Sequence, residues 1–301
     1  MKETVPNYYP AFRCLAADCR HSCCIGWEID IDEDSLARHD AVSGPMGQRL
    51  QESIDRTDTP HFRLDAEERC PFLNVEGLCD LICTMGEDAL CQICADHPRF
   101  RNCFSHCTEL GLGLVCEGAA ELVLSQTAPM ELICLSDDGT DCQPDEDEAE
   151  LLQLRRTAMQ IAQDRGFSIW ERMEHLTEFF DLPIIEDAKR WAKTYLALER
   201  LDKGWTVLLK QLEAAPPAAC CDTQDLPAEQ LLVYFLYRHV PAALWDGDPY
   251  SKIAFAVLST HMILWLHAAT ELPLQELARM YSGEVEYSDE NLEILWDALN
   301  E

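Results

Sequence analysis

The chain has 301 residues, of which 48% are hydrophobic, and its 55 acidic and 23 basic residues give a net charge of −32. This length and apolar content are typical of a globular protein with one large or two ordinary domains, not of a disordered chain. The charge repels phosphate backbones, so no nucleic-acid partner is expected; it suits a lysine-bearing partner, although plain solubility is the simpler explanation.

The first residues bear on the compartment of the protein. Residues 1–13 contain neither the apolar run nor the cleavage site of a secretory signal, so a cytoplasmic location is expected. In a reducing compartment, the thiols of such a chain are expected to bind metal or to be catalytic, and a disulfide framework would suit a much shorter chain.

Residues 1–135 are predicted to form a cysteine-rich, metal- or cluster-binding region. Short helices are expected at Asp34–His39, Gly47–Ile54 and Glu117–Leu124. The segments around the cysteines are expected to be loops, because metal bonds would then set the path of the backbone.

Residues 136–150 are predicted to be an acidic linker or loop. The segment contains eight carboxylates and no large apolar side chain. It separates the cysteine-rich region from a predicted helical domain at residues 151–301.

The second half shows helical periodicity almost throughout. Ser168 and Glu171 have the spacing of a capping box, and Gly283 is expected to stop a helix. The predicted helices are Ala149–Arg165, Ile169–Phe180, Ile184–Leu201, Ala228–Val240, Ile253–Ala269, Leu274–Tyr281 and a last helix from Ser288 to Leu299.

One apolar stretch, Ile253–Ala269, invites comparison with a membrane span. It contains Ser259, Thr260, His261 and His267, and it is shorter than the roughly 20 apolar residues that a span usually needs. A buried core helix with two satisfied histidines is therefore expected, and no membrane partner. The predicted fold class is mainly α, with an irregular cysteine-rich N-terminal half packed on a C-terminal helical half.

Fourteen of the sixteen cysteines lie within the first 142 residues. The first group, Cys14, Cys19, Cys23 and Cys24, is compact enough to wrap a polynuclear cluster, whereas one tetrahedral zinc ion would leave some of its thiols idle. The radical S-adenosylmethionine signature, with cysteines spaced x3 and then x2, is absent.

A second group of cysteines leaves several metal sites open. The pairs Cys91/Cys94 and Cys103/Cys107 resemble a four-thiolate zinc knuckle, and His97 and His106 stand near enough in sequence to be alternative ligands. One cluster, a cluster with zinc, and zinc alone all agree with the spacing. Inert buried thiols are expected at Cys134, Cys142, Cys220 and Cys221.

An ordered series of motifs resembles that of the flagellin lysine-N-methylase family. Its most specific element is the doubled cysteine followed by Gly26-Trp27, and the series reaches both ends of the chain. Its members are Tyr8-Tyr9, Phe12, Cys14, Cys19, Cys23-Cys24-Ile25-Gly26-Trp27, Cys70-Pro71-Phe72-Leu73, Gly77-Leu78-Cys79, Cys94, His97-Pro98-Arg99, Cys116-Glu117-Gly118-Ala119-Ala120, Glu284-Val285-Glu286-Tyr287-Ser288 and Glu290-Asn291-Leu292.

The resemblance implies an enzyme, a protein-lysine N-methyltransferase. It would methylate surface lysines of flagellin or a similar protein with S-adenosylmethionine as donor, and would carry a cysteine-ligated iron–sulfur cluster of the 4Fe–4S type. Around Cys116 the chain departs from the family, reading Val-Cys-Glu-Gly where relatives have Ser-Cys-Pro-Glu. The implied metal ligands are Cys14, Cys19, Cys23, Cys24, Cys70, Cys79, Cys94 and Cys116; the additional Cys83, Cys91, Cys103 and Cys107 leave room for a second metal such as zinc.

Methylation requires a neutral lysine amine. At a pKa near 10.4, about one lysine amine in 2,500 is neutral at pH 7. The site must therefore offset a deprotonation cost of roughly 4–5 kcal/mol. Tyr8, Tyr9 and Trp27 are candidate catalytic residues that could line a lysine channel by cation–π contact, although core packing is the simpler explanation for Trp27. Arg99 is the candidate for binding the donor's carboxylate, with a surface ion pair as the alternative.

Two functions of other classes agree with the same thiols. One is a non-catalytic metal-chelating or electron-transfer module, which would explain why no glycine-rich donor-binding fingerprint is found. The other is a zinc-stabilised interaction protein.

Overall fold

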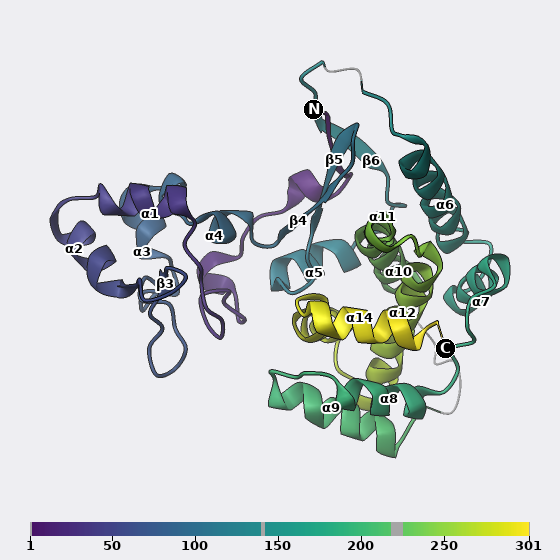
Figure 1. The fold of residues 1–301 in the computed structure, drawn as a ribbon. Helices are drawn as coiled ribbons and strands as arrows, with labels where there is room; N and C mark the ends of the chain where they lie inside the picture. Colours follow the sequence, from purple (N-terminus) through teal and green to yellow (C-terminus); the bar gives the residue numbers. More distant parts are fainter. Residues whose placement is uncertain (1, 140–141, 218–224, 301) are drawn as a thin grey trace. The chain divides into compact units, whose positions relative to one another are not determined.

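The computed structural model describes residues 2–139, 142–217 and 225–300, and the fold is mainly α, as predicted (Figure 1). The chain forms two compact units. The helical unit comprises Met1–Phe12, Phe100–Val115 and Ala119–Glu301, and the cysteine unit comprises Arg13–Arg99 and Cys116–Gly118. The chain therefore leaves the helical unit after Phe12 and re-enters it at Phe100.

Most of the helical unit is built around two buried helices, α10 and α12. Helix α10 packs against α6 and α12, and α12 also contacts α9, α13 and α14. The helices are α5 (Glu117–Leu124), α6 (Glu146–Ala162), α7 (Ile169–Phe180), α8 (Ala188–Ala197), α9 (Lys203–Ala214), α10 (Asp225–His239), α11 (Ala243–Asp246), α12 (Pro249–Thr270), α13 (Leu274–Tyr281) and α14 (Asp289–Ala298).

Several helix boundaries confirm the sequence predictions. The capping box at the start of α7 is formed, with the Ser168 hydroxyl and the Glu171 carboxylate each accepting from the other's backbone N–H. Ser288 caps α14. Local side-chain chemistry fixes these ends, so they can be read from the sequence.

Other helix predictions were wrong. Helix α8 ends at Ala197, and the separate helix α9, capped by Asp202, was missed. Gly283 does not stop the chain's helical path, because α13 continues into a π-helical turn at Ser282–Glu286. In that turn the Glu284 carboxylate accepts backbone N–H groups of Leu201 and Asp202, so a tertiary contact holds the turn together.

The helical unit also contains a four-stranded sheet, where the sequence predicted loops around the cysteines. The strands are β1 (Lys2–Pro6), β4 (Arg99–Cys103), β5 (Cys107–Leu112) and β6 (Leu132–Ser136), in the order β4-β5-β1-β6. Strand β1 pairs parallel with β5 and antiparallel with β6. These pairings join residues about a hundred positions apart, which a local pattern does not reveal.

The acidic segment 136–150 is not solvated throughout its described part. Helix α6 begins inside it at Glu146, with Asp145 as its cap. The buried Glu148 carboxylate accepts hydrogen bonds from the Ser105 backbone N–H and hydroxyl, both at 2.5 Å. One carboxylate of the segment therefore fastens α6 to the loop before β5.

Helix α12 is the one helix of the described chain that is long and apolar enough to cross a membrane. Its most apolar window is 72% buried within the protein, so the predicted core helix is confirmed. His267 Nδ1 lies 2.6 Å from the Leu272 carbonyl oxygen, as expected of a satisfied core histidine. His261 differs, because its Nδ1 has no hydrogen-bond partner in the described chain and burial lowers its pKa to about 3.

A buried carboxylate, Glu286, joins the π-helical turn to α10. It accepts hydrogen bonds from the Tyr234 hydroxyl (2.9 Å), lies 2.6 Å from His239 Nε2 and pairs with Arg238 at 3.3 Å. Burial alone would raise the pKa of Glu286, but the Arg238 charge and the His239 hydrogen bond outweigh it and lower the pKa to about 2.

Glu286→Gln should therefore destabilise the helical unit by about 3 kcal/mol at pH 7, because Arg238 loses its buried counter-charge. Because the pKa of Glu286 is lower in the folded protein than its ordinary value of about 4.5, the ionised carboxylate stabilises the fold fully at pH values above 4.5. That contribution to the unfolding free energy is lost as the pH falls toward about 2. The difference in unfolding free energy between wild type and variant, measured by denaturant titration, should shrink over this pH range.

Glu293→Gln is the matched control, because Glu293 lies exposed on α14. Its effect should stay within about 0.5 kcal/mol at every pH. Equal effects of the two substitutions would contradict the role assigned to Glu286.

Candidate functional site

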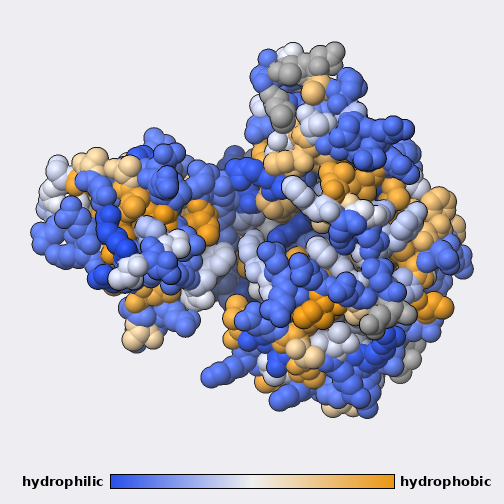
Figure 2. All heavy atoms as spheres, in the orientation of Figure 1, coloured by the Kyte–Doolittle hydropathy of each residue, from blue (hydrophilic) through white to orange (hydrophobic). Residues whose placement is uncertain are grey.

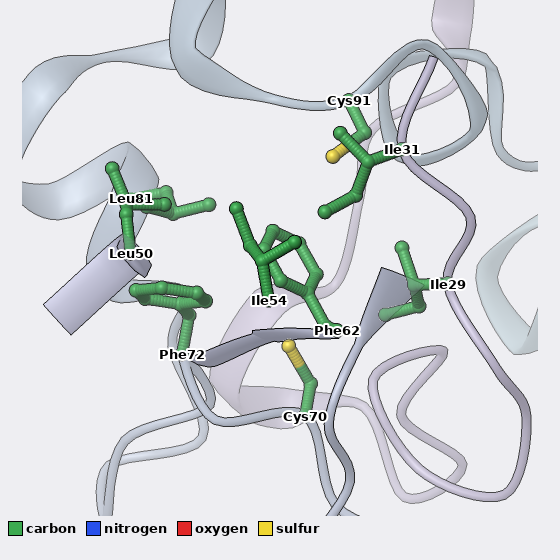
Figure 3. Packing of buried hydrophobic residues seen from close by; sticks show 9 residues of the cluster. All are labelled: Ile29, Ile31, Leu50, Ile54, Phe62, Cys70, Phe72, Leu81 and Cys91. Atoms are coloured by element: carbon green, nitrogen blue, oxygen red, sulfur yellow. The ribbon is translucent and has the colours of Figure 1, made fainter. Parts of the chain in front are cut away.

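The cysteine unit is built on a small apolar core that contains thiols (Figure 3). Cys70 and Cys91 are buried in this core together with Phe62, Phe72 and Leu81. Three further cysteines, Cys24, Cys79 and Cys94, pack against it half-buried. The helices of this unit are α1 (Glu33–Asp40), α2 (Gly44–Ser53), α3 (Asp80–Met85) and α4 (Gln92–Asp96), with a short hairpin of β2 (Ile54–Asp55) and β3 (His61–Phe62).

Backbone hydrogen bonds hold the cysteine-bearing segments side by side. The Cys70 N–H donates to the Cys24 carbonyl oxygen at 2.8 Å. Leu73 forms an isolated antiparallel bridge with Cys79, and the next N–H, of Asp80, donates to the Phe72 carbonyl oxygen at 2.8 Å. The first cysteine group, Cys70 and the start of α3 are thus fixed to one another by main-chain contacts.

Arg49 of α2 reinforces this arrangement. Its guanidinium donates to Asp80 Oδ2 at 2.7 Å and to the Pro71 carbonyl oxygen at 2.5 Å. It also lies over the Phe72 ring, 4.9 Å from the ring centre. Arg49 therefore joins the Cys70 loop to the start of the helix that follows Cys79.

Four thiols form a mutually interacting set, which we call the thiol quartet: Cys24, Cys70, Cys79 and Cys94. All four pack on the same apolar core, and negative charge on Cys24 raises the pKa of each of the other three. Burial raises the pKa of Cys70 to about 12 and also raises that of Cys79, and negative charge on the neighbouring sulfurs raises both further. Ionisation of all four together requires a cation among them.

Two hydrogen-bonded thiol pairs extend the quartet. Cys23 donates to Cys24, which raises the pKa of Cys23 and lowers that of Cys24 to about 7. Cys91 is hydrogen-bonded to Cys94, and this bond, with burial, raises the pKa of Cys94. Cys14 is coupled to Cys23.

The remaining two predicted ligands, Cys19 and Cys116, form a second, smaller group with Glu117. Cys19 and Cys116 are electrostatically coupled, and Cys19 Sγ lies 3.7 Å from Glu117 Oε2. The same carboxylate accepts the Arg20 backbone N–H at 2.9 Å and pairs with its guanidinium. Of the eight predicted ligands, six are therefore linked through the quartet and two are not, while Cys91, predicted as an addition, is linked to it.

The other additional cysteines, Cys83, Cys103 and Cys107, are not part of the apolar core on which the quartet packs. Cys83 is exposed on α3, and Cys103 and Cys107 belong to the helical unit. A zinc site that combines them with Cys91 stays a prediction. In the described residues, no group of three or more His, Cys, Asp or Glu side chains is arranged to hold a metal ion.

The prediction of inert, buried thiols is wrong for Cys134 and Cys142, the two that the structure describes. Cys134 is exposed on β6, every residue of which faces solvent, and Cys142 is exposed as well. Cys220 and Cys221 lie outside the described residues.

The aromatic candidates are divided between the units. Tyr8 is buried and Tyr9 half-buried in the helical unit, and burial raises the pKa of Tyr8 above its ordinary value. Trp27 is half-buried in the cysteine unit, donates from Nε1 to the Cys23 carbonyl oxygen at 2.6 Å and meets the His97 ring edge-on at 5.3 Å. Trp27 is thereby fixed to the backbone of the doubled cysteine.

Arg99, the candidate for the donor's carboxylate, caps the end of α4. Its Nη1 donates to the carbonyl oxygens of Ala95 (3.3 Å) and His97 (3.5 Å). Burial, with a contribution from the Arg99 charge, lowers the pKa of His97 to about 4, so this imidazole is neutral at pH 7. His97 and Arg99 thus present one uncharged and one cationic donor group beside the Cys91–Cys94 segment.

Comparison with curated proteins confirms the resemblance read from the sequence. Over 142 residues, 44% of this chain, it is 26% identical to lysine-N-methylases of Salmonella typhimurium and Salmonella choleraesuis. Over the same length it is 27% identical to the flagellar biosynthetic protein FliU of Salmonella muenchen. The match spans about a third (35%) of the two lysine-N-methylases and 84% of FliU. No family model and no solved structure matches the chain.

Phe72→Ala should lower the unfolding free energy of the cysteine unit by about 3–5 kcal/mol, because Phe72 is fully buried and its loss leaves a cavity in the core behind the quartet. Hydrogen exchange in the segment that contains Cys70 and Cys79 should accelerate accordingly, and alkylation of both thiols should become faster.

Val75→Ala is the control, since Val75 is 95% exposed in the same loop, and it should change neither readout measurably. Unchanged exchange in Phe72→Ala would show that the core does not hold these thiols.

Proposed function

We propose that this protein takes part in the N-methylation of lysine side chains on flagellin or a similar protein, with S-adenosylmethionine as the methyl donor. The observation that carries the proposal is the similarity to proteins named lysine-N-methylase and FliU. The thiol quartet supports it, because the motifs that supply its cysteines are those on which the resemblance rests.

The surface of the protein suits a cationic substrate. With a net charge of −32, its field attracts a lysine-rich surface and raises the rate of encounter. The face seen in Figure 2 is largely hydrophilic. Association with the substrate protein should consequently weaken as salt increases.

The proposed reaction is a group transfer. The methyl carbon leaves the donor's sulfonium sulfur with neither electron of that bond, and the lysine nitrogen supplies the pair for the new N–C bond. S-adenosylhomocysteine and one proton are the other products. The lysine must lose its proton, which costs roughly 4–5 kcal/mol at pH 7, and desolvation in an apolar or aromatic site reduces this cost.

We further propose that the quartet ligates an iron–sulfur cluster. The donor set suits such a cluster in chemical type, because four soft thiols pack on one core, and burial and neighbouring charge oppose ionisation of Cys70, Cys79 and Cys94 unless a cation is present. When bound, the cluster supplies a redox-active centre and the charge that stabilises the four thiolates. Cys23 and Cys91, each hydrogen-bonded to a quartet thiol, and Cys14, which interacts with Cys23, are the further thiols available as ligands, and Trp27 would shield the Cys23–Cys24 segment from water.

Single substitution of each quartet cysteine by alanine should lower the iron and sulfide content of anaerobically isolated protein by more than half, because each removes one ligand. Iron and sulfide analysis, together with the visible absorption of the cluster, measures this loss. Cys83→Ala, which removes an exposed thiol from the same unit, should retain the wild-type content.

Retention of full iron and sulfide in the four quartet variants, or equal loss in Cys83→Ala, would contradict this assignment. Zinc in place of iron and sulfide would favour the zinc-stabilised interaction protein.

The methylation itself is tested with anaerobically isolated, iron-loaded protein, methyl-labelled S-adenosylmethionine and flagellin. Label should appear on flagellin lysines, located by peptide mass spectrometry. Flagellin with acetylated lysines is the control and should take up none, because acetylation removes the nucleophilic amine. Absence of label on unmodified flagellin, with donor binding also absent, would favour the electron-transfer alternative.

A further inference from the structure

The helical unit contains a cavity of about 480 Å³ that the proposed function does not use. Strands β1 and β5 and helix α6 contribute most of its lining. Lys2 pairs with Cys107, and Thr4 with Glu109, across the two parallel strands, and all four residues line the cavity. A volume of this size is typical of sites for small organic ligands.

The charges of the lining are opposite to the charge of the protein. Its cations are Lys2, Arg155 and Arg156, and its single carboxylate is Glu109. Glu109 is neutralised by Arg155 in a bidentate pair with N–O distances of 2.7 and 2.6 Å, both side chains being 4% exposed. The cavity therefore carries a net excess of two positive charges on a chain whose total is −32.

Both excess charges are available to a ligand. Lys2 and Arg156 are exposed at the cavity, and in the described part of the chain neither pairs with a carboxylate. Among the described residues, Arg156 donates only to the neutral Gln153 Oε1, at 3.1 Å. An ammonium and a guanidinium together recognise a carboxylate by charge-assisted hydrogen bonds.

The rest of the lining is mostly apolar. Met130 and Met159 contribute flexible, polarizable side chains, and Leu152 contributes an aliphatic one. Thr4 Oγ1 is buried at the cavity without a hydrogen-bond partner in the described chain, which is costly unless a ligand or water satisfies it. This combination fits an apolar body with an anionic end.

We propose that this cavity binds a small organic carboxylate with an apolar body, its carboxylate held by Lys2 and Arg156. All lining residues of the site belong to the helical unit, whereas the thiol quartet belongs to the cysteine unit, so the proposal does not depend on methylation.

The test uses 4-phenylbutanoate as the probe, titrated into the full-length protein by calorimetry. Its neutral isostere, 4-phenylbutan-1-ol, should bind the wild-type protein at least tenfold more weakly than the carboxylate does. The carboxylate should also bind the double variant Lys2→Gln/Arg156→Gln at least tenfold more weakly than it binds wild type. In both cases the charge-assisted contacts are lost. Inorganic phosphate should not compete, since it has no apolar body.

A matched control is Lys193→Gln/Lys210→Gln, which removes two exposed positive charges from α8 and α9 of the same unit. The affinity of this control variant for 4-phenylbutanoate should stay within about twofold of that of wild type. A second, site-resolved readout is alkylation of Cys107, which lines the cavity, followed by peptide mass spectrometry. Bound probe should slow this alkylation at least fivefold and leave the exposed Cys134 unaffected.

Equal binding of the alcohol, equal binding by Lys2→Gln/Arg156→Gln, competition by phosphate, or unprotected Cys107 at saturation would each overturn the proposal. Failure of the wild-type protein to bind the probe would overturn it as well.

Discussion

The burial of several thiols against one small apolar core is the constraint on which the cysteine unit depends. A neutral thiol behaves as a small hydrophobic group, so Cys70 and Cys91 can fill this core as they stand. The thiolate form is different, because each added negative charge opposes ionisation of its neighbours. The same packing therefore lets Cys24 ionise near neutral pH, and it opposes ionisation of Cys70, Cys79 and Cys94 unless a cation lies among them.

The helical unit is held together by other means. Its core is formed by α10 and α12, and its buried charges are paired: Glu229, for example, accepts from both Arg165 and Arg172. Removing one partner of such a pair leaves an uncompensated buried charge. These ion pairs therefore favour one specific packing of the helices that they join.

The cysteine unit is inserted in the sequence of the helical unit, a feature that the similarity alone does not reveal. Residues 13–99 leave the helical unit between β1 and β4, and the chain returns there to complete the sheet with β5 and β6. Resemblance to the lysine-N-methylases covers about a third of their length. The quartet and the cationic cavity follow from the burial and contacts of this chain's own residues, and the similarity supports only the proposed class of reaction.

The sequence by itself determined the helices that end in local chemistry, such as the capping box of Ser168, and the dense cysteine motifs that carry the resemblance. These features depend on residues within a few positions of one another. Only the tertiary structure decided that β1 pairs with β5, that Cys134 faces solvent, and which thiols pack on the same apolar core. Spacing alone could not separate Cys24, Cys70, Cys79 and Cys94 from Cys19 and Cys116, because contacts such as the Cys70–Cys24 backbone hydrogen bond join segments that are distant in sequence.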